Sequence, residues 1–285
     1  MKGIILPRKG IAIETARAMS AFKRSLAGAV VFAGLQGAVA ATPTPAHAPQ
    51  LPPNLEIMPL GDSITFGYPG SNGGYRGPLY ELLAPVASNV LFVGSSTCNH
   101  GVTTLPSGQW HNEGHGSYAI NDIRLNLDGF DDTLYRQYGG DDRDPHGGHW
   151  LDGIESGPNA RPSLHPDIIL LLIGTNDRDN PDGAKSRLDA LVGKLVTMRP
   201  EAKLIVARIP PEMDTKAHGR FVEEFNKGVD SVVKKYARKK NVWCVDLNTG
   251  FPPDGLSPDK LHPNDIGYDW MAQRWYEAIV KIAGI

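Results

Sequence analysis

The stretch "LEIMPLGDSITFG" (Leu55–Gly67) passes from a short apolar run into a polar turn that carries one serine, Ser63. An apolar run that is continuous rather than alternating is typical of a strand buried on both faces of a parallel sheet. A polar residue directly after such a strand lies at the carboxyl end of the sheet, where open α/β sheets bind their ligands. The stretch therefore predicts a fold class and places Ser63 at its functional edge.

Four more apolar runs rich in Val, Ile and Leu follow along the chain. They are "VLFVGS" from Val90, "DIILLLIG" from Asp167, "KLIVARI" from Lys203 and "VWCVDL" from Val242. Amphipathic stretches that predict helices cover 183–198, 220–240 and 265–284. Alternation of strand and helix favours a mostly parallel sheet with helices on both faces. We therefore expect one α/β domain over 55–285, interrupted by a long Gly-, Asp- and Pro-rich insertion at 129–166.

The first 54 residues differ in composition from the rest of the chain. Lys23 and Arg24 precede the apolar run "LAGAVVFAGL", and "AVA" (Ala38–Ala40) has the small residues of a cleavage site. This pattern predicts a secretory signal peptide over 1–40, with Met19 as an alternative start, and a Pro-rich linker over 41–54. No later segment approaches the roughly 20 apolar residues that a membrane helix needs. We expect a secreted, extracellular protein.

The net charge of the chain bears on whether it binds nucleic acid. The chain after residue 40 holds 23 basic and 30 acidic residues, a net charge of about −7 with His neutral. An acidic chain of this kind is a poor ligand for nucleic acid. We expect neither a nucleic-acid nor a membrane partner, and we expect a monomer.

Residues that could activate Ser63 follow the other apolar runs. Asn176 in "GTND" ends the third run, while Asp259 and His262 in "SPDKLHPN" follow the fifth. A serine hydroxyl needs a base, and imidazole can take its proton near neutral pH. Asp259, three residues before His262 on a turn, can bind the other ring nitrogen and stabilise the imidazolium. The sequence predicts a Ser63–His262–Asp259 triad.

A tetrahedral intermediate also needs hydrogen-bond donors for its oxyanion. The candidates are the backbone N–H of Ser63, the side-chain amide of Asn176 and a backbone N–H from the turn "GHGSY". Within that turn, Gly116 allows close approach of the backbone to a substrate, and Ser117 is the alternative donor. The sequence leaves the choice between these two residues open.

The four blocks "GDSIT", "GHGSY", "GTND" and "DKLH" occur in the order found in the SGNH, or GDSL, hydrolases, which the chain resembles over 55–285. The resemblance implies a three-layer flavodoxin-like fold with a five-stranded parallel sheet in the order 2-1-3-4-5. It implies catalytic roles for Ser63, Asn176 and His262, with Asp259 as the orienting acid. It implies no cofactor.

Within that superfamily, "GGYR" and "NEGHGSYAI" are most similar to secreted carbohydrate esterases that remove acetyl groups from plant polysaccharides. One departure lies in the second block, where the family usually has Ser-Gly and this chain has Gly116-Ser117. The function that this resemblance implies is hydrolysis of short-chain, acetyl esters of poly- or oligosaccharides through an acyl-enzyme.

Three alternatives remain from the sequence. A lysophospholipase or lipase of the same superfamily, or a thioesterase, would differ from a carbohydrate esterase only in the loops that select the substrate. A catalytically inactive carbohydrate-binding protein would have the same fold. The loops near Ser63 are dominated by Gly, Asp, Asn, His and Pro, which offer little surface to a fatty acyl chain. An α/β-hydrolase is disfavoured because its nucleophile elbow reads G-x-S-x-G, and position 65 is a threonine.

Candidates for substrate contact are Asp62, beside the serine, and the indoles of Trp110 and Trp150, which could stack on sugar rings. Arg76 is interpreted as a surface residue at a helix start. The segment "DDRDPHGGH" (Asp141–His149) lacks both the ligand register of a calcium loop and the usual zinc spacings. We therefore expect no metal there.

The two cysteines, Cys98 and Cys244, lie near the second and fifth strands. In the order 2-1-3-4-5 these strands are opposite edges, separated by several steps of about 4.8 Å, whereas a disulfide needs Cα atoms within roughly 7 Å. We expect no disulfide between them.

Overall fold

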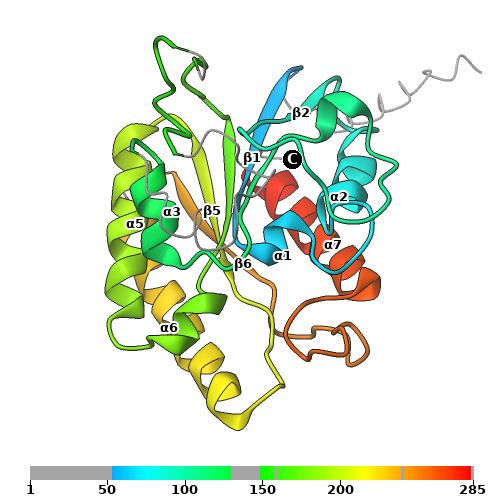
Figure 1. Ribbon diagram of the computed structural model, residues 1–285, viewed down its shortest axis with the longest axis vertical. Helices are drawn as coiled ribbons and strands as arrows, with labels where there is room; N and C mark the ends of the chain where they lie inside the picture. The colour runs from blue at the N-terminus through cyan, green and yellow to red at the C-terminus, as the bar shows by residue number, and fades with distance from the viewer. Residues whose placement is uncertain (1–52, 130–147, 158–159, 239–240, 284–285) are drawn as a thin grey trace, which may run out of the picture. The chain divides into compact units, whose positions relative to one another are not determined.

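The computed structural model describes residues 53–129, 148–157, 160–238 and 241–283, which all lie in one unit of the chain, Pro45–Ile285 (Figure 1). The predicted signal peptide, nearly all of the linker and most of the 129–166 insertion lie outside the described residues.

The sheet is built from the five apolar runs and has the predicted order. Its strands are β1 (Leu55–Gly61), β2 (Val90–Phe92), β4 (Ile168–Leu172), β5 (Lys203–Arg208) and β6 (Val242–Asp246). They run parallel in the order β2-β1-β4-β5-β6, which confirms the order 2-1-3-4-5 of the five runs. A further short strand, β3 (Glu113–Gly114), pairs with the end of β1, so that Gly114 lies opposite Gly61. Two residues carry no periodicity, so the sequence could not indicate β3.

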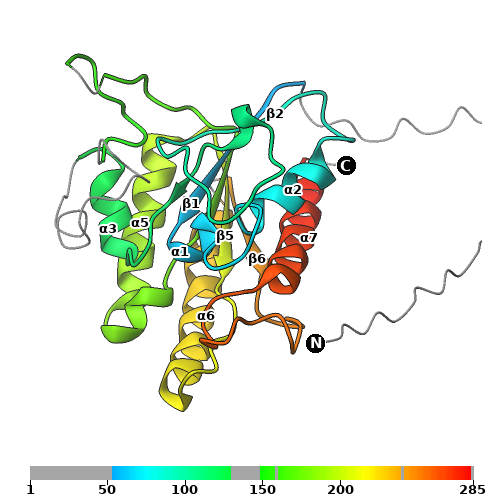
Figure 2. The ribbon, with the colours of Figure 1, turned by 45° about the vertical axis from the view of Figure 1, so that its right-hand side comes forward.

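Helices cover both faces of this sheet (Figures 1 and 2). α2 (Arg76–Leu83) packs against α7 (Asp265–Ile282) on one face, and α3 (Ile120–Asn126), α5 (Ala184–Met198) and α6 (Lys216–Ala237) pack in sequence on the other. α6 begins before the predicted 220 because Thr215 caps it, accepting a hydrogen bond from the backbone N–H of His218. Among the described residues, no helix combines the length and apolar composition needed to cross a membrane.

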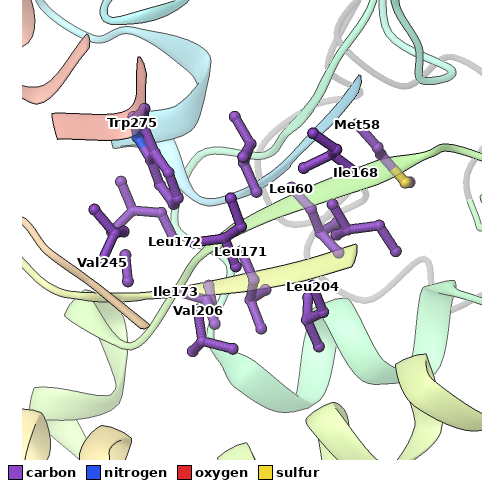
Figure 3. Packing of buried hydrophobic residues seen from close by; sticks show 14 of the residues in the cluster. Met58, Leu60, Ile168, Leu171, Leu172, Ile173, Leu204, Val206, Val245 and Trp275 are labelled. Atoms are coloured by element: carbon purple, nitrogen blue, oxygen red, sulfur yellow. The ribbon is translucent and has the colours of Figure 1, made fainter. Parts of the chain in front are cut away.

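The core lies where the central strands meet the two helix layers (Figure 3). All five residues of β4 are buried, and neighbouring β1 and β5 are almost as fully covered. Trp275 of α7 packs near Leu172 and Val245 from one side of the sheet (Figure 3). The continuous apolar runs therefore are strands buried on both faces, as predicted.

The cysteines lie toward opposite edges of the sheet. Cys244 is in β6, and Cys98 follows β2. No disulfide joins them, which confirms the prediction from strand order.

Candidate active site

Ser63 is the first residue of a single-turn helix, α1 (Ser63–Phe66), which follows β1 after one residue. That residue, Asp62, caps the helix by accepting a hydrogen bond from the backbone N–H of Ile64 at 2.9 Å. Gly67 ends the helix in the left-handed region, at φ 99°, and donates to the carbonyls of Ser63 and Ile64. The strand, the cap and the glycine thus hold Ser63 half-buried at the carboxyl edge of the sheet.

Two glycines make room for this turn. A Cβ on Gly61 would lie 2.0 Å from the carbonyl oxygen of Leu172 in β4, and a Cβ on Gly114 would lie 2.3 Å from the backbone nitrogen of Phe66. Neither contact is tolerable for a real side chain. The turn that carries Ser63 is therefore packed backbone to backbone between β3 and β4.

Ser63, His262 and Asp259 form one chain of hydrogen bonds. The Oγ of Ser63 lies 2.9 Å from Nε2 of His262, and Nδ1 of His262 lies 2.7 Å from Oδ2 of Asp259. The other oxygen of Asp259 accepts the backbone N–H groups of Leu261 and His262, each at 3.0 Å. Partial burial raises the pKa of Asp259, but these hydrogen bonds outweigh it and leave the pKa below its usual value. Asp259 is thus an ionised partner that favours the proton on Nδ1 and leaves Nε2 to accept one from Ser63.

The turn that carries the histidine is tied at both ends. The backbone N–H of Ser257 donates to the carbonyl of His262, and Lys260 lies in the left-handed region with φ 60°. Asn264 caps α7 by accepting the N–H of Gly267. The phenol ring of Tyr68 meets the imidazole of His262 edge-on, with ring centroids 5.0 Å apart, and is 43% exposed. The base is thus presented on a rigid loop beside an accessible aromatic ring.

Two of the predicted oxyanion donors lie in segments that a hydrogen bond joins, the turn after β3 and the 3₁₀ helix after β4. The N–H of His115 extends the β3–β1 pairing to the carbonyl of Gly61, and the N–H of Tyr118 closes a turn over 115–118 by donating to the carbonyl of His115. Asn176 lies in the 3₁₀ helix η2 (Thr175–Asp179) after β4, and its side-chain amide donates to the carbonyl of Tyr118 at 2.9 Å. This contact uses one of its two N–H bonds.

The turn between them contains both alternatives for the third donor. Gly116 is half-buried and Ser117 is exposed, with Ser117 in the left-handed region at φ 67°. A serine in that conformation is strained by about 1 kcal/mol. Which of the two supplies an N–H to an oxyanion stays a prediction.

Arg76 is not a surface residue, so its interpretation from the sequence is wrong. Its guanidinium is fully buried and donates to the carbonyls of Thr65 (3.2 Å), Phe66 (3.2 Å) and Trp110 (3.3 Å). Burial lowers the pKa of Arg76 to about 10, so it stays charged at neutral pH. The first two carbonyls end α1 and have no partner within that helix. Arg76 therefore fixes the helix that carries Ser63.

Asp62 and Trp150, the other predicted substrate contacts beside Trp110, are buried in the structure. Asp62 is 0% exposed, and burial raises its pKa to about 7. Trp150 is 1% exposed and stacks on the imidazole of His115, with ring planes 1° apart and centroids 4.3 Å apart. A sequence gives the type of a side chain but not the face on which it lies. Trp110 is 37% exposed, and its contact with a substrate stays a prediction.

The segment considered for a metal is described only at its end. His146 and the aspartates 141, 142 and 144 lie outside the described residues, and His149 pairs with Asp152 at 3.1 Å.

Comparison with known proteins identifies relatives along almost the whole described chain. A family model, the GDSL-like Lipase/Acylhydrolase family, matches residues 60–270. A multidomain esterase of Ruminococcus flavefaciens is 30% identical over 237 residues, which make up 79% of this chain and 28% of that protein. The chain therefore spans less than a third of the length of this curated relative.

Two solved structures have a similar fold. A family 3 carbohydrate esterase of Clostridium thermocellum is 26% identical, with a TM-score of 0.56, over 80% of this chain and 98% of that one. An acetyl esterase variant with a bound acetate ion is 23% identical, with a TM-score of 0.61, over 81% of this chain and 98% of that one.

Proposed function

Because the chain belongs to the GDSL-like lipase/acylhydrolase family, we propose that it is a serine esterase of the SGNH type that hydrolyses carboxylic esters through an acyl-enzyme. The observation that carries the proposal is the continuous hydrogen-bonded chain from the Oγ of Ser63 through His262 to Asp259. A nucleophile, a base and an orienting acid are the three groups that acyl transfer by serine requires.

In the first half-reaction, the Oγ of Ser63 attacks the ester carbonyl carbon while Nε2 of His262 takes its proton. Asp259, bonded to Nδ1, stabilises the imidazolium that forms. The oxyanion accepts hydrogen bonds from the backbone N–H of Ser63, the amide of Asn176 and one N–H of the 115–118 turn. When the intermediate collapses, His262 gives its proton to the leaving alkoxide, and the alcohol departs.

The second half-reaction repeats these steps with water. His262 removes a proton from a water molecule, whose oxygen attacks the acyl carbon of the Ser63 ester. The second tetrahedral intermediate uses the same donors. Its collapse breaks the bond to Oγ, returns the proton from His262 to Ser63 and releases the carboxylic acid.

As the substrate, we propose acetyl esters of carbohydrates, hydrolysed outside the cell. The composition of the first 40 residues supports secretion, and the family 3 carbohydrate esterase of C. thermocellum supports the sugar. The exposed ring of Tyr68 beside His262 supports it as well, because His262 protonates the leaving alcohol and an aromatic face there can contact a sugar ring.

The test is a series of p-nitrophenyl esters from acetate to octanoate, together with acetylated xylan. An acyl groove would add roughly 0.8 kcal/mol, about fourfold, for each buried CH₂. We expect kcat/KM to be highest for acetate and to fall steeply by octanoate, with release of acetate from xylan. An equal or higher kcat/KM for octanoate than for acetate would contradict a carbohydrate ester as the substrate and favour a lipid ester.

The serine mechanism is tested separately by Ser63→Ala and His262→Ala. Each should remove nearly all activity on p-nitrophenyl acetate while the thermal unfolding curve stays close to that of the unaltered protein. A Ser63→Ala protein with near-normal turnover would contradict the mechanism whatever the substrate.

A further inference from the structure

A second group of polar side chains gathers where β5 connects to α6. The segment "EMDTKAH" (Glu212–His218) supplies two carboxylates and an imidazole, from Glu212, Asp214 and His218. One ligand-type atom of each residue lies within 4.8 Å of the others. The residues belong neither to the Ser63 triad nor to the predicted oxyanion donors.

Glu212 is a buried carboxylate without a hydrogen bond. Its side chain is 2% exposed, and neither of its oxygens has a hydrogen-bond partner. The nearest cation, Arg178, lies 3.6 Å from Oε2, beyond hydrogen-bond distance. The carboxylate is therefore held by one ion pair, with Arg178, and by no hydrogen bond, so both of its oxygens can still accept a ligand.

Asp214 and His218 line the accessible side of the group. Nδ1 of His218 lies 2.7 Å from Oδ2 of Asp214, and both side chains are partly exposed. Their backbone is fixed, because Thr215 donates its N–H to Asp214 and accepts the N–H of His218 through its hydroxyl at the start of α6. An ion could therefore enter from solvent and reach Glu212 without unfolding the segment.

We propose that Glu212, Asp214 and His218 bind one divalent transition-metal cation, with Zn²⁺ as the best fit. Two carboxylates and one imidazole match the ligand preference of Zn²⁺, whereas Ca²⁺ and Mg²⁺ prefer sites made of oxygen atoms alone. Ligand atoms on a tetrahedral zinc ion are about 3.4 Å apart, so side-chain rotations must bring the three groups closer together. On binding, Nδ1 of His218 coordinates the metal in place of its hydrogen bond to Asp214, which requires the neutral imidazole with its proton on Nε2.

The site would support the active site without taking part in its chemistry. The backbone N–H of Met213, between two of the ligands, donates to the carbonyl of Lys260 in the turn that carries Asp259 and His262. Arg178, next to Glu212, follows Asn176 by two residues in η2. A bound cation would thus fix the segment that lies between these two parts of the active site. The proposal rests on the three ligands and not on the esterase activity.

The experiment uses the chain after removal of any affinity tag and of metal by EDTA and dialysis. Isothermal titration with ZnCl₂ should give one ion per chain, and saturating Zn²⁺ should raise Tm by about 5–10 °C. MgCl₂ and CaCl₂ should bind at least tenfold more weakly. Glu212→Gln and His218→Ala should each weaken Zn²⁺ binding at least tenfold and remove the rise in Tm.

Two matched controls distinguish this site from other acidic and histidine side chains. Glu223→Gln changes an exposed glutamate in α6, the helix that carries His218. His149→Ala removes the histidine that pairs with Asp152. Both should bind Zn²⁺ as the unaltered chain does.

Three results would overturn the proposal. They are failure of the unaltered chain to bind one ion, unchanged binding by Glu212→Gln, or loss of binding in His149→Ala. If His218→Ala does not fold, Asp214→Asn replaces it with the same expected loss.

Discussion

Asp62 offers the sharpest test of how the fold holds the nucleophile. Its carboxyl group is fully buried between β1 and α1, one oxygen accepts the N–H of Ile64, and the other has no hydrogen-bond partner. Burial, the largest influence, raises the pKa of Asp62 from 3.8 to about 7, with a smaller contribution from the charge of Asp177. Asparagine is almost isosteric and caps helices equally well. Asp62→Asn therefore removes the titration and keeps the cap.

The direction of the pH dependence follows from the protonation of Asp62 in the folded and in the unfolded chain. Below pH 4 the carboxyl is protonated in both the folded and the unfolded protein, so its titration changes nothing. Between pH 4 and pH 7 the unfolded chain loses the proton while the folded protein keeps it, and stability falls as pH rises. A difference of about three pKa units corresponds to a loss of about 4 kcal/mol by pH 7, levelling off above it.

The assay is urea unfolding of the unaltered protein and of Asp62→Asn at intervals from pH 4 to pH 8. The free energy of unfolding of the variant, relative to the unaltered protein, should rise by a few kcal/mol between pH 4 and pH 7. Titrating groups that do not interact with Asp62 cancel in this difference. Asp254→Asn, at an exposed position, is the control and should give a flat difference. A flat difference for Asp62→Asn as well would refute the view that Asp62 is buried as a neutral acid.

Three further predictions concern the surroundings of the nucleophile and the sheet. Arg76→Ala removes three hydrogen bonds from a buried guanidinium to the carbonyls of Thr65, Phe66 and Trp110 and leaves a cavity, so the free energy of unfolding should fall by about 4 kcal/mol and Tm by about 10 °C in thermal unfolding. Asn176→Ala should lower kcat on the order of 10²- to 10³-fold with little change in KM, as measured by steady-state kinetics, because the amide acts on the oxyanion. Thiol titration of the denatured, unreduced chain should find both Cys98 and Cys244, whereas a disulfide would contradict the strand order.

The sequence predicted the strands and the gathering of Ser63, Asp259 and His262 for one physical reason. Strands buried on both faces are continuous apolar runs, and a parallel sheet brings the residues after those runs to one edge. No knowledge of side-chain packing is needed for either step. The strand β3 was missed because it has only two residues, and it forms only where the folded chain brings them beside the end of β1.

Two residues were misjudged from the sequence, Asp62 and Arg76, and a third buried polar residue, Glu212, was not considered there. Asp62, Arg76 and Glu212 are polar, and from the sequence a polar residue is most simply placed on the surface. Each is buried by segments far away in the chain: Arg76 reaches Trp110, and Glu212 faces Arg178. Burying charged groups in this way costs stability, and these three surround the elements that hold the triad and Asn176. We therefore expect the neutral substitution Asp62→Asn to stabilise the protein above pH 7, where a buried carboxylate is least favourable, and Arg76→Ala to destabilise it, because Arg76 supplies donors that α1 lacks. If both substitutions destabilised the protein equally at pH 8, burial of the Asp62 carboxylate would not be the cost that the structure indicates.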